Sequence, residues 1–364
     1  MAARSGTGRR LRRLPLSTDN LPPGPAMTST ETDTYDEAAF NEGAECAVGE
    51  EREIQAGIDR EDRAFEESGQ KKRPVQAGAR RYPEPPLPGQ HQLKPGDEAA
   101  LQPQPMYDAP FYKGSGKLED KVALVTGGDS GIGRAVAVLF AREGADVAVA
   151  YLDEHADAEE TRRAVEKEGR RCILLPGDVA DPAFAEAAVE ATLKAFGGLD
   201  VLVNNAAFQE HASELADITE AHFDRTLKTN LYGYFHMARA AVPHMKPGSA
   251  IVMTGSVTGL MGNKDLLDYS MTKGGVHAFA RSLSSNLLDK AIRVNVVAPG
   301  PVWTPLNPAD KSADKVAQFG KSAEMGRPAQ PEEIAPAYVF LASPQCSSFI
   351  TGEILPIIGG YGGG

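Results

Sequence analysis

The stretch DYSMTK, residues 268–273, holds a tyrosine and a lysine four positions apart, Tyr269 and Lys273. On a helix, residues at this spacing share one face, so the lysine ammonium lies beside the phenol. A free tyrosine has a pKa of roughly 10, too high for a base at neutral pH, and a neighbouring cation lowers it. The pair can therefore exchange a proton with a substrate oxygen, provided that the fold places both groups at a ligand site.

A third polar group, Ser256, ends the apolar run AIVMTGS (250–256) upstream of the tyrosine. The carboxyl end of a strand is where open α/β sheets place their ligands. A hydroxyl at that position can hydrogen-bond a carbonyl oxygen or a developing alkoxide. Each of these residues alone has an ordinary structural explanation, and only their combination on a suitable fold indicates catalysis.

A glycine-rich turn supplies the first sign of such a fold. The segment VALVTGGDSGIGRAV places Gly127, Gly131 and Gly133 between an apolar run at 122–126 and a helical pattern at 132–143. Glycine lets the backbone turn sharply and approach a pyrophosphate, and a helix start offers free N–H groups and a positive dipole end. The turn therefore predicts a dinucleotide site; a tight turn without a ligand is the alternative.

The rest of the chain after Leu118 alternates short apolar runs with helical patterns. Continuous apolar strands separated by helices predict a parallel sheet covered on both faces, a doubly wound Rossmann-type α/β fold. We expect this catalytic domain to span 118–364. The predicted strands lie at 122–126, 147–152, 172–178, 201–207, 250–256, 293–300 and 348–360.

The first part of the chain has a different composition. Residues 1–70 are predicted to form a disordered extension, because the acidic tract at 31–67 has too little apolar surface for a core. The Arg-rich start, 1–26, is either an organelle transit peptide or a stretch ahead of a true start at Met27. Residues 71–117 are Pro-rich with several aromatics, which predicts an extended strap packed on the core or on a neighbouring subunit.

Composition excludes several classes of protein. The chain has 364 residues and a net charge of −12, which argues against nucleic acid as a partner. No apolar run is long enough to span a membrane. The three cysteines, Cys46, Cys172 and Cys346, form neither a metal pattern nor a disulfide framework, so we expect no metal site and a reducing, cytoplasmic location.

Taken in order, these motifs resemble the short-chain dehydrogenase/reductase family. TGGDSGIG resembles the cofactor signature of the family, and Asp178-Val179, Asn204 to Ala207 and Pro299-Gly300 follow at the family's positions. The resemblance covers about Leu118 to Gly360. With the strap, the chain is similar to a branch that includes glucose or ribitol dehydrogenases and general-stress oxidoreductases. It implies an NAD(P)-dependent oxidoreductase that interconverts alcohols and carbonyls, usually as a homotetramer.

The resemblance also implies roles for individual residues. Tyr269 is the general acid/base, Ser256 holds the substrate oxygen, Lys273 lowers the tyrosine pKa together with the cationic nicotinamide ring, and Asn230 holds a water in a proton relay. It assigns cofactor contacts to Gly127, Ser130, Gly131, Ile132, Gly133, Asp178, Val179, Asn204, Ala206, Tyr269, Lys273, Pro299, Gly300, Val302 and Thr304.

Cofactor preference depends on the end of the second predicted strand. NAD enzymes place an acid there and NADP enzymes place an arginine nearby. This chain has Tyr151 at the family's acidic position, followed by Asp153 and Glu154, and Ser130 where many NADP members carry arginine. The acids favour NAD over NADP. The only tryptophan, Trp303, lies between two predicted nicotinamide contacts, so we expect its indole beside the nicotinamide ring.

The substrate is not defined by the sequence. We expect its pocket to be lined by Phe208, Gln209, residues 257–262 and the loop 305–325, a mixture that suits a small aldehyde, a sugar or a polyol. The alternative function is a catalytically silent dinucleotide-binding scaffold or sensor whose N-terminal arm recruits a partner. Retention of all four catalytic residues favours the enzyme.

Overall fold

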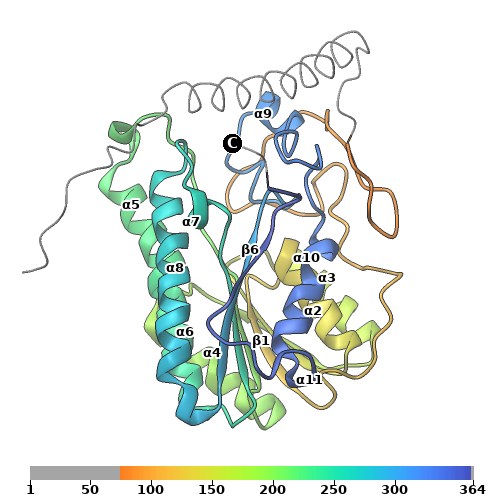
Figure 1. Ribbon diagram of the computed structural model, residues 1–364, viewed down its shortest axis with the longest axis vertical. Coiled ribbons are helices and arrows are strands. Elements are labelled where there is room, and N and C mark those ends of the chain that lie inside the picture. Colours follow the sequence, from red (N-terminus) through yellow and green to blue (C-terminus); the bar gives the residue numbers. More distant parts are fainter. Residues whose placement is uncertain (1–73, 362–364) are drawn as a thin grey trace, which may run out of the picture. The chain divides into compact units, whose positions relative to one another are not determined.

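A seven-stranded, fully parallel sheet forms the centre of the protein, as the computed structural model of residues 74–361 shows (Figure 1). Its strand order is β3-β2-β1-β4-β5-β6-β7. Strands β2 and β3 are added on one side of β1 and strands β4 to β7 on the other, so the topological switch point lies between β1 and β4. This confirms the predicted doubly wound α/β fold. The strands are β1 (Val122–Thr126), β2 (Asp146–Tyr151), β3 (Cys172–Pro176), β4 (Val201–Asn204), β5 (Ala250–Thr254), β6 (Arg293–Pro299) and β7 (Ile354–Ile357).

Helices cover both faces of the sheet (Figure 1). One face packs against α2 (Gly131–Arg142), α3 (His155–Lys167) and α10 (Pro331–Ala342). The other packs against α4 (Pro182–Phe196), α6 (Gly233–Ala241) and α8 (Leu267–Asn286). The shorter helices are α5 (Glu220–Leu227), α7 (Thr258–Met261), α9 (Ala313–Ala317), α11 (Pro344–Ser347), a π-helical turn η2 (Lys228–Tyr232), and the 3₁₀ turns η1 (Leu215–Asp217), η3 (Val242–His244) and η4 (Leu288–Lys290).

The apolar strands account for this layering. Successive side chains of a strand point to opposite faces, so a strand that is apolar throughout must be covered on both sides. In β1, Val125 packs into the core shared with α2 and α10, whereas Leu124 packs into the core shared with α4, α6 and α8. All five β1 residues are buried.

Most strands end earlier than their apolar runs suggested. The predicted runs at 201–207 and 250–256 stop as strands at Asn204 and Thr254, and the run at 172–178 stops at Pro176. The remaining residues leave the sheet because backbone at the carboxyl ends of the strands lines a ligand cavity instead of pairing with a neighbour.

The described part of the Pro-rich strap, residues 74–117, packs on its own chain and contains no helix or strand. Two buried carboxylates of the sheet domain hold it. Glu332, at the start of α10, pairs with Arg80 and accepts the Ala109 N–H at 2.9 Å. Glu143, at the end of α2, accepts the N–H groups of Ser115 and Lys117 at 2.9 Å each. The predicted extension 1–70 lies outside the described residues.

Candidate active site

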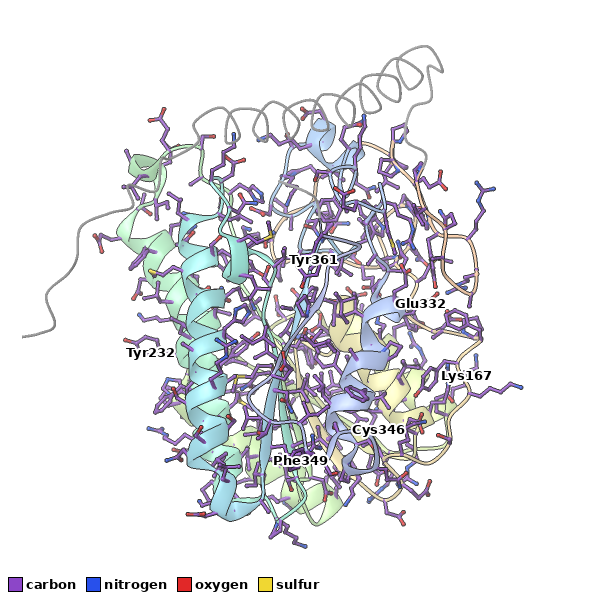
Figure 2. The ribbon with its side chains drawn as sticks, viewed as in Figure 1. Lys167, Tyr232, Glu332, Cys346, Phe349 and Tyr361 are labelled. Atoms are coloured by element: carbon purple, nitrogen blue, oxygen red, sulfur yellow. The ribbon has the colours of Figure 1, made fainter. Side chains whose placement is uncertain are left out.

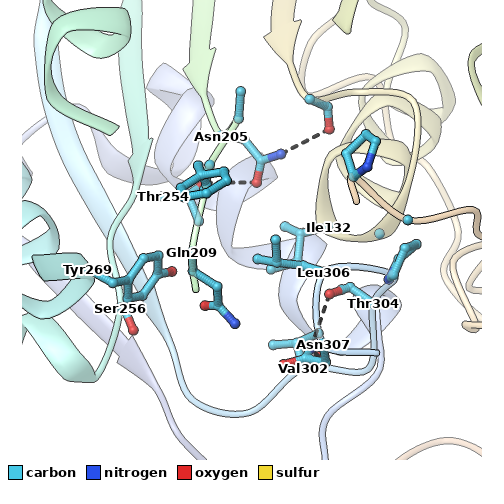
Figure 3. A pocket seen from close by; sticks show the side chains of 18 of the residues that line it. Ile132, Asn205, Gln209, Thr254, Ser256, Tyr269, Val302, Thr304, Leu306 and Asn307 are labelled. Atoms are coloured by element: carbon cyan, nitrogen blue, oxygen red, sulfur yellow. Dashed lines mark hydrogen bonds between the residues drawn. The ribbon is translucent and has the colours of Figure 1, made fainter. Parts of the chain in front are cut away.

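A cavity of about 620 Å³ opens at the carboxyl ends of the strands, in the size range of ligand sites. Its walls come from the glycine-rich turn, from the segments that follow β2 to β6, and from strap residues Pro95 and Gly96. Tyr269 and Ser256 lie together at one end of the close-up, and Ile132, Leu306 and Thr304 lie toward the other (Figure 3).

Tyr269 and Ser256 face this cavity from two different elements. Tyr269 stands in the first turn of α8 and Ser256 follows the end of β5, and each is about 8% exposed. The Ser256 hydroxyl lies beside the Tyr269 phenol, and its oxygen accepts the Thr258 N–H at 3.1 Å. The structure therefore places an acid/base candidate and a hydroxyl donor side by side at one wall.

Lys273 lies one turn after Tyr269 on the same face of α8 and has no solvent exposure. Its Nζ is 5.4 Å from the centre of the Tyr269 ring. The ammonium donates to the main-chain oxygen of Thr254 at 2.7 Å and to the Tyr234 hydroxyl at 3.2 Å. These two acceptors fix the lysine head between α8, α6 and the end of β5.

Burial dominates the protonation of both groups. It raises the pKa of the Tyr269 phenol above its usual range, and the neighbouring Ser256 hydroxyl offsets this only in part. Burial lowers the pKa of the Lys273 ammonium to about 7. The sequence argument expected a lowered tyrosine pKa. In the protein alone the direction is opposite, because desolvation penalises a phenolate and an ammonium alike.

Asn230 lies behind the cavity wall. It lies in the π-helical turn η2, is fully buried, and is not among the residues that line the cavity. Its amide binds the main chain of Phe208 at both ends, accepting from the N–H and donating to the carbonyl oxygen at 2.8 Å each. It also donates to Thr272 on α8 at 3.1 Å. Asn230 thus holds the Phe208 wall of the pocket against the catalytic helix.

The glycine-rich turn is shaped for close approach of a phosphate. Gly127 and Gly131 have φ of +60° and +51°, which other residues rarely adopt, and a Cβ on Gly133 would stand 1.8 Å from the Gly127 carbonyl oxygen. Ser130 does not cap α2 with its side chain, and the first turn of the helix holds no acidic residue. The helix start, where Ser130, Gly131 and Ile132 line the cavity, fits a dinucleotide pyrophosphate.

Most of the predicted cofactor residues line this cavity, with two exceptions. Gly133 lies behind the turn, and Asn204 is fully buried in β4 with its Nδ2 donating to the Tyr234 carbonyl oxygen at 3.1 Å. The neighbouring Asn205 lines the cavity instead, because the chain leaves the sheet after Asn204. The residues found in the lining are Gly127, Ser130, Gly131, Ile132, Asp178, Val179, Ala206, Tyr269, Lys273, Pro299, Gly300, Val302 and Thr304.

The end of the cavity beside β2 is acidic. Tyr151, Glu154 and Asp178 line it, whereas the Asp153 side chain is exposed to solvent. The one arginine in the described lining, Arg225, is paired with Asp178 at 2.6 Å. No free cation of the described chain therefore faces this end.

A polar cluster lies at the other end, where the sequence predicted Gln209 and the loop 305–325 but not His211. The buried Asp310 carboxylate accepts the His211 N–H at 2.7 Å, the Gln209 amide at 2.8 Å and the His211 ring. Burial opposes ionisation, but these hydrogen bonds hold the pKa of Asp310 below its ordinary value. His211 and Lys311 line the cavity. These residues carry no motif, since loops far apart in sequence bring them together.

The expected position of Trp303 is wrong. Its neighbours Val302 and Thr304 line the cavity, but the indole is fully buried in a small separate core with Leu87, Leu101 and Val316. Its Nε1 donates to the carbonyl oxygen of Pro103 at 2.7 Å. The tryptophan therefore anchors the strap, because alternate residues of the 302–304 segment face opposite sides.

Two further features bear on the class of protein. Over residues 74–361, no group of three His, Cys, Asp or Glu side chains is arranged to hold a metal ion. None of the helices in this range combines the length and the apolar character that crossing a bilayer requires.

Comparison with known proteins agrees with this geometry. A family model described as enoyl-(acyl carrier protein) reductase matches residues 127–362. General stress protein 39 of Bacillus subtilis is 51% identical over 275 residues, which are 75% of this chain and 96% of that protein. Glucose and ribitol dehydrogenase of Daucus carota is 47% identical over 279 residues, 75% of this chain and 96% of that protein.

Solved structures show the same likeness. A short-chain dehydrogenase from Burkholderia cenocepacia in complex with NADP is 34% identical with a TM-score of 0.63, and the match covers 67% of this chain and 98% of that one. A 3-ketoacyl-(acyl-carrier-protein) reductase from Brucella melitensis complexed with NADH is also 34% identical, with a TM-score of 0.60 and the same coverage. With strand order, glycine-rich turn and Ser256–Tyr269–Lys273 site in agreement, the chain belongs to the short-chain dehydrogenase/reductase family.

Proposed function

We propose that the protein is an NAD(P)-dependent oxidoreductase that interconverts an alcohol and a carbonyl. The observation that carries the proposal is the convergence of Ser256, Tyr269 and Lys273 on a cavity that the start of helix α2 also lines. The nicotinamide, when bound, supplies or accepts the hydride. The start of α2 and the segment from Pro299 to Thr304 would hold the cofactor.

The protein's own groups manage the proton. The Ser256 hydroxyl holds the substrate oxygen, and Tyr269 donates its phenolic proton to that oxygen during reduction or takes it back during oxidation. Burial keeps the phenol protonated, which suits the donor role. Lys273 provides positive charge next to the phenolate that remains, and its bonds to Thr254 and Tyr234 keep that charge in place.

NAD(H) is the proposed preference. Glu154 lines the cavity beside Tyr151, and a carboxylate there repels a 2′-phosphate. The one arginine of the described lining is already paired with Asp178. One related structure is a complex with NADP and another is a complex with NADH, so charge at this end decides the proposal.

The proposed substrates are small aldehydes, sugars or polyols. The relative from Daucus carota is named for glucose and ribitol. Here the substrate end combines Gln209, His211 and Lys311, held by the buried Asp310. Such a set of donors and acceptors suits a ligand with several hydroxyl groups.

The proposal extends to assembly and location. Apolar side chains stand exposed over α5, α6, α8 and η2, among them Phe235 and Met271, and Tyr232 lies on the outer side of this helix layer (Figure 2). We propose that this surface pairs with a second copy in a homotetramer. Cys172 and Cys346 are free, which is compatible with a cytoplasmic location.

The test is a turnover assay with NADH and with NADPH against a panel of aldehydes and aldoses, with the products identified by mass spectrometry. We expect reduction of at least one class and a higher kcat/KM with NADH. Tight dinucleotide binding without turnover on any carbonyl or alcohol would instead favour the silent scaffold or sensor with its partner-recruiting arm. A higher kcat/KM with NADPH would refute the proposed cofactor preference alone.

A further inference from the structure

A short part of the strap, residues 94–103, touches both ends of the active site. We call it the bracket. On the substrate side, the Lys94 ammonium donates to the carbonyl oxygen of Gln209 at 2.7 Å. Gly96 has a φ of +109°, and a Cβ there would lie 2.8 Å from the Pro305 carbonyl oxygen, so only glycine allows this approach. The bracket thus forms part of the substrate wall.

On the cofactor side, the bracket inserts one carboxylate behind the glycine-rich turn. Glu98 is 2% exposed. Its Oε2 accepts the N–H of Gly131 at 2.5 Å, and its Oε1 accepts from the Arg134 guanidinium at 2.6 Å. The same guanidinium donates to the carbonyl oxygen of Asp129 at 2.9 Å. Glu98 and Arg134 therefore bind the main chain of the turn on both sides of Ser130, at Gly131 and at Asp129.

These contacts of Glu98 and Arg134 with the turn lie outside the cavity. Gly131 and Ile132 line the cavity, whereas Glu98 and Arg134 do not. Arg134 is held from other directions by Thr161 at 3.0 Å and by Asp157 at 3.2 Å. Asp157 also accepts the backbone N–H of Glu98 at 2.8 Å. The carboxylate consequently supports the turn from its rear, and it is paired there with the arginine.

We propose that Glu98 is a positioning residue for the cofactor: by holding Gly131 and Arg134 it keeps the glycine-rich turn in the shape that receives a dinucleotide. The inference rests on the proposed function, since it assigns a binding role to that same turn. It gives the strap a part in cofactor affinity in addition to its part in stability. Without Glu98, the Gly131 N–H loses its acceptor and the turn is free to relax.

The chain offers a matched control for this proposal. Glu332 is likewise buried, accepts one backbone N–H, that of Ala109, and pairs with one arginine, Arg80, but it is absent from the cavity lining. Glu332→Gln and Glu98→Gln therefore make the same chemical change at two anchors of the strap. Glu98→Ala removes the support completely, and Asp157 and Thr161 still hold Arg134 in that variant.

The experiment measures NADH and NADPH binding by calorimetry, kcat at saturating cofactor, and hydrogen exchange of the amides in 127–134. We expect Glu98→Ala to weaken binding at least tenfold and Glu98→Gln to weaken it less, with kcat changed under threefold and faster exchange in the turn. Glu332→Gln should change affinity less than twofold.

Two results would overturn the inference. One is unchanged or tighter dinucleotide binding in both Glu98 variants. Unchanged binding would mean that the turn holds its shape without Glu98, and tighter binding would mean that removing the negative charge helps the cofactor more than the loss of support harms it. The other is an equal loss of dinucleotide affinity in Glu332→Gln, which would show that Glu98 acts only through the general stability of the strap. Failure of the wild-type protein to bind any dinucleotide would instead refute the proposed function.

Discussion

Lys273 lies one helical turn from Tyr269, with its Nζ 5.4 Å from the centre of the tyrosine ring and bonded to other partners. The lysine is therefore anchored independently of the phenol. Its charge reaches the tyrosine through space, in a site where burial alone keeps the phenol neutral and makes the ammonium easy to deprotonate. Two mutational predictions depend on this relationship.

Tyr269→Phe should bind cofactor normally and lose at least about two orders of magnitude in turnover, the scale of general acid–base catalysis. Steady-state rates and calorimetric binding test both halves. Tyr338→Phe is a suitable control, because it removes another buried hydroxyl, one bonded to Thr254, from outside the described cavity lining. A Tyr269→Phe rate close to wild type would show that another group transfers the proton.

Lys273→Met should reveal a pH-dependent cost of burying the lysine. The folded-state pKa is about 7, below the unfolded value of 10.5, so between these values unfolding takes up a proton and raising the pH stabilises the folded state. The unfolding free energy of the wild type should rise relative to the variant by up to about 1.4 kcal/mol per pH unit in this window. Below pH 7 the cost is fully present.

Denaturant unfolding at pH 7 and pH 9 measures this difference. Lys290→Met, at an exposed site in η4, controls for the loss of a lysine as such. A constant difference between wild type and Lys273→Met at the two pH values would mean that the buried lysine keeps its proton at pH 9.

Leu101→Ala should loosen the strap at Trp303. Both side chains are fully buried in the same small core, and truncation of a buried leucine costs about 2–5 kcal/mol. The single tryptophan should emit at short wavelength in the wild type and shift to the red in the variant at lower denaturant concentration. An unchanged fluorescence transition would contradict the assigned role of Trp303 as the strap's anchor.

A chain that starts at Lys71 should keep full turnover, because every described residue of the cavity lining falls between Pro95 and Ser322. A chain that starts at Lys117 should unfold at lower temperature and bind cofactor weakly, since it lacks Leu101 and Glu98. If the strap also packs on a neighbouring subunit, this second deletion weakens subunit assembly as well. Calorimetry and sedimentation separate the two effects, and an unchanged melting temperature would refute the stabilising role of the strap.

The sequence by itself determined the layered fold and the type of chemistry. An apolar run such as VALVT has no charged side chain for solvent, so its composition alone predicts a strand that is buried on both faces. The spacing of Tyr269 and Lys273 places both residues on one face of a helix, wherever that helix lies in the fold. The glycines of the turn likewise predict a backbone conformation that other residues rarely adopt, and Gly127 and Gly131 have the positive φ that this requires. Strand burial, a shared helical face and a glycine backbone are local properties, so a short stretch of sequence is enough to predict them.

Only the tertiary structure decided which residues meet. The direction of the Trp303 indole depends on strap residues two hundred positions away, and the pairing of Glu98 with Gly131 joins an irregular segment to the first turn of α2. The shifts in pKa of Tyr269 and Lys273 follow from desolvation, which depends on everything packed around them. Such contacts leave no periodic pattern in the sequence. Each arises from packing between segments that are far apart in the chain, so the position of one partner does not determine the position of the other.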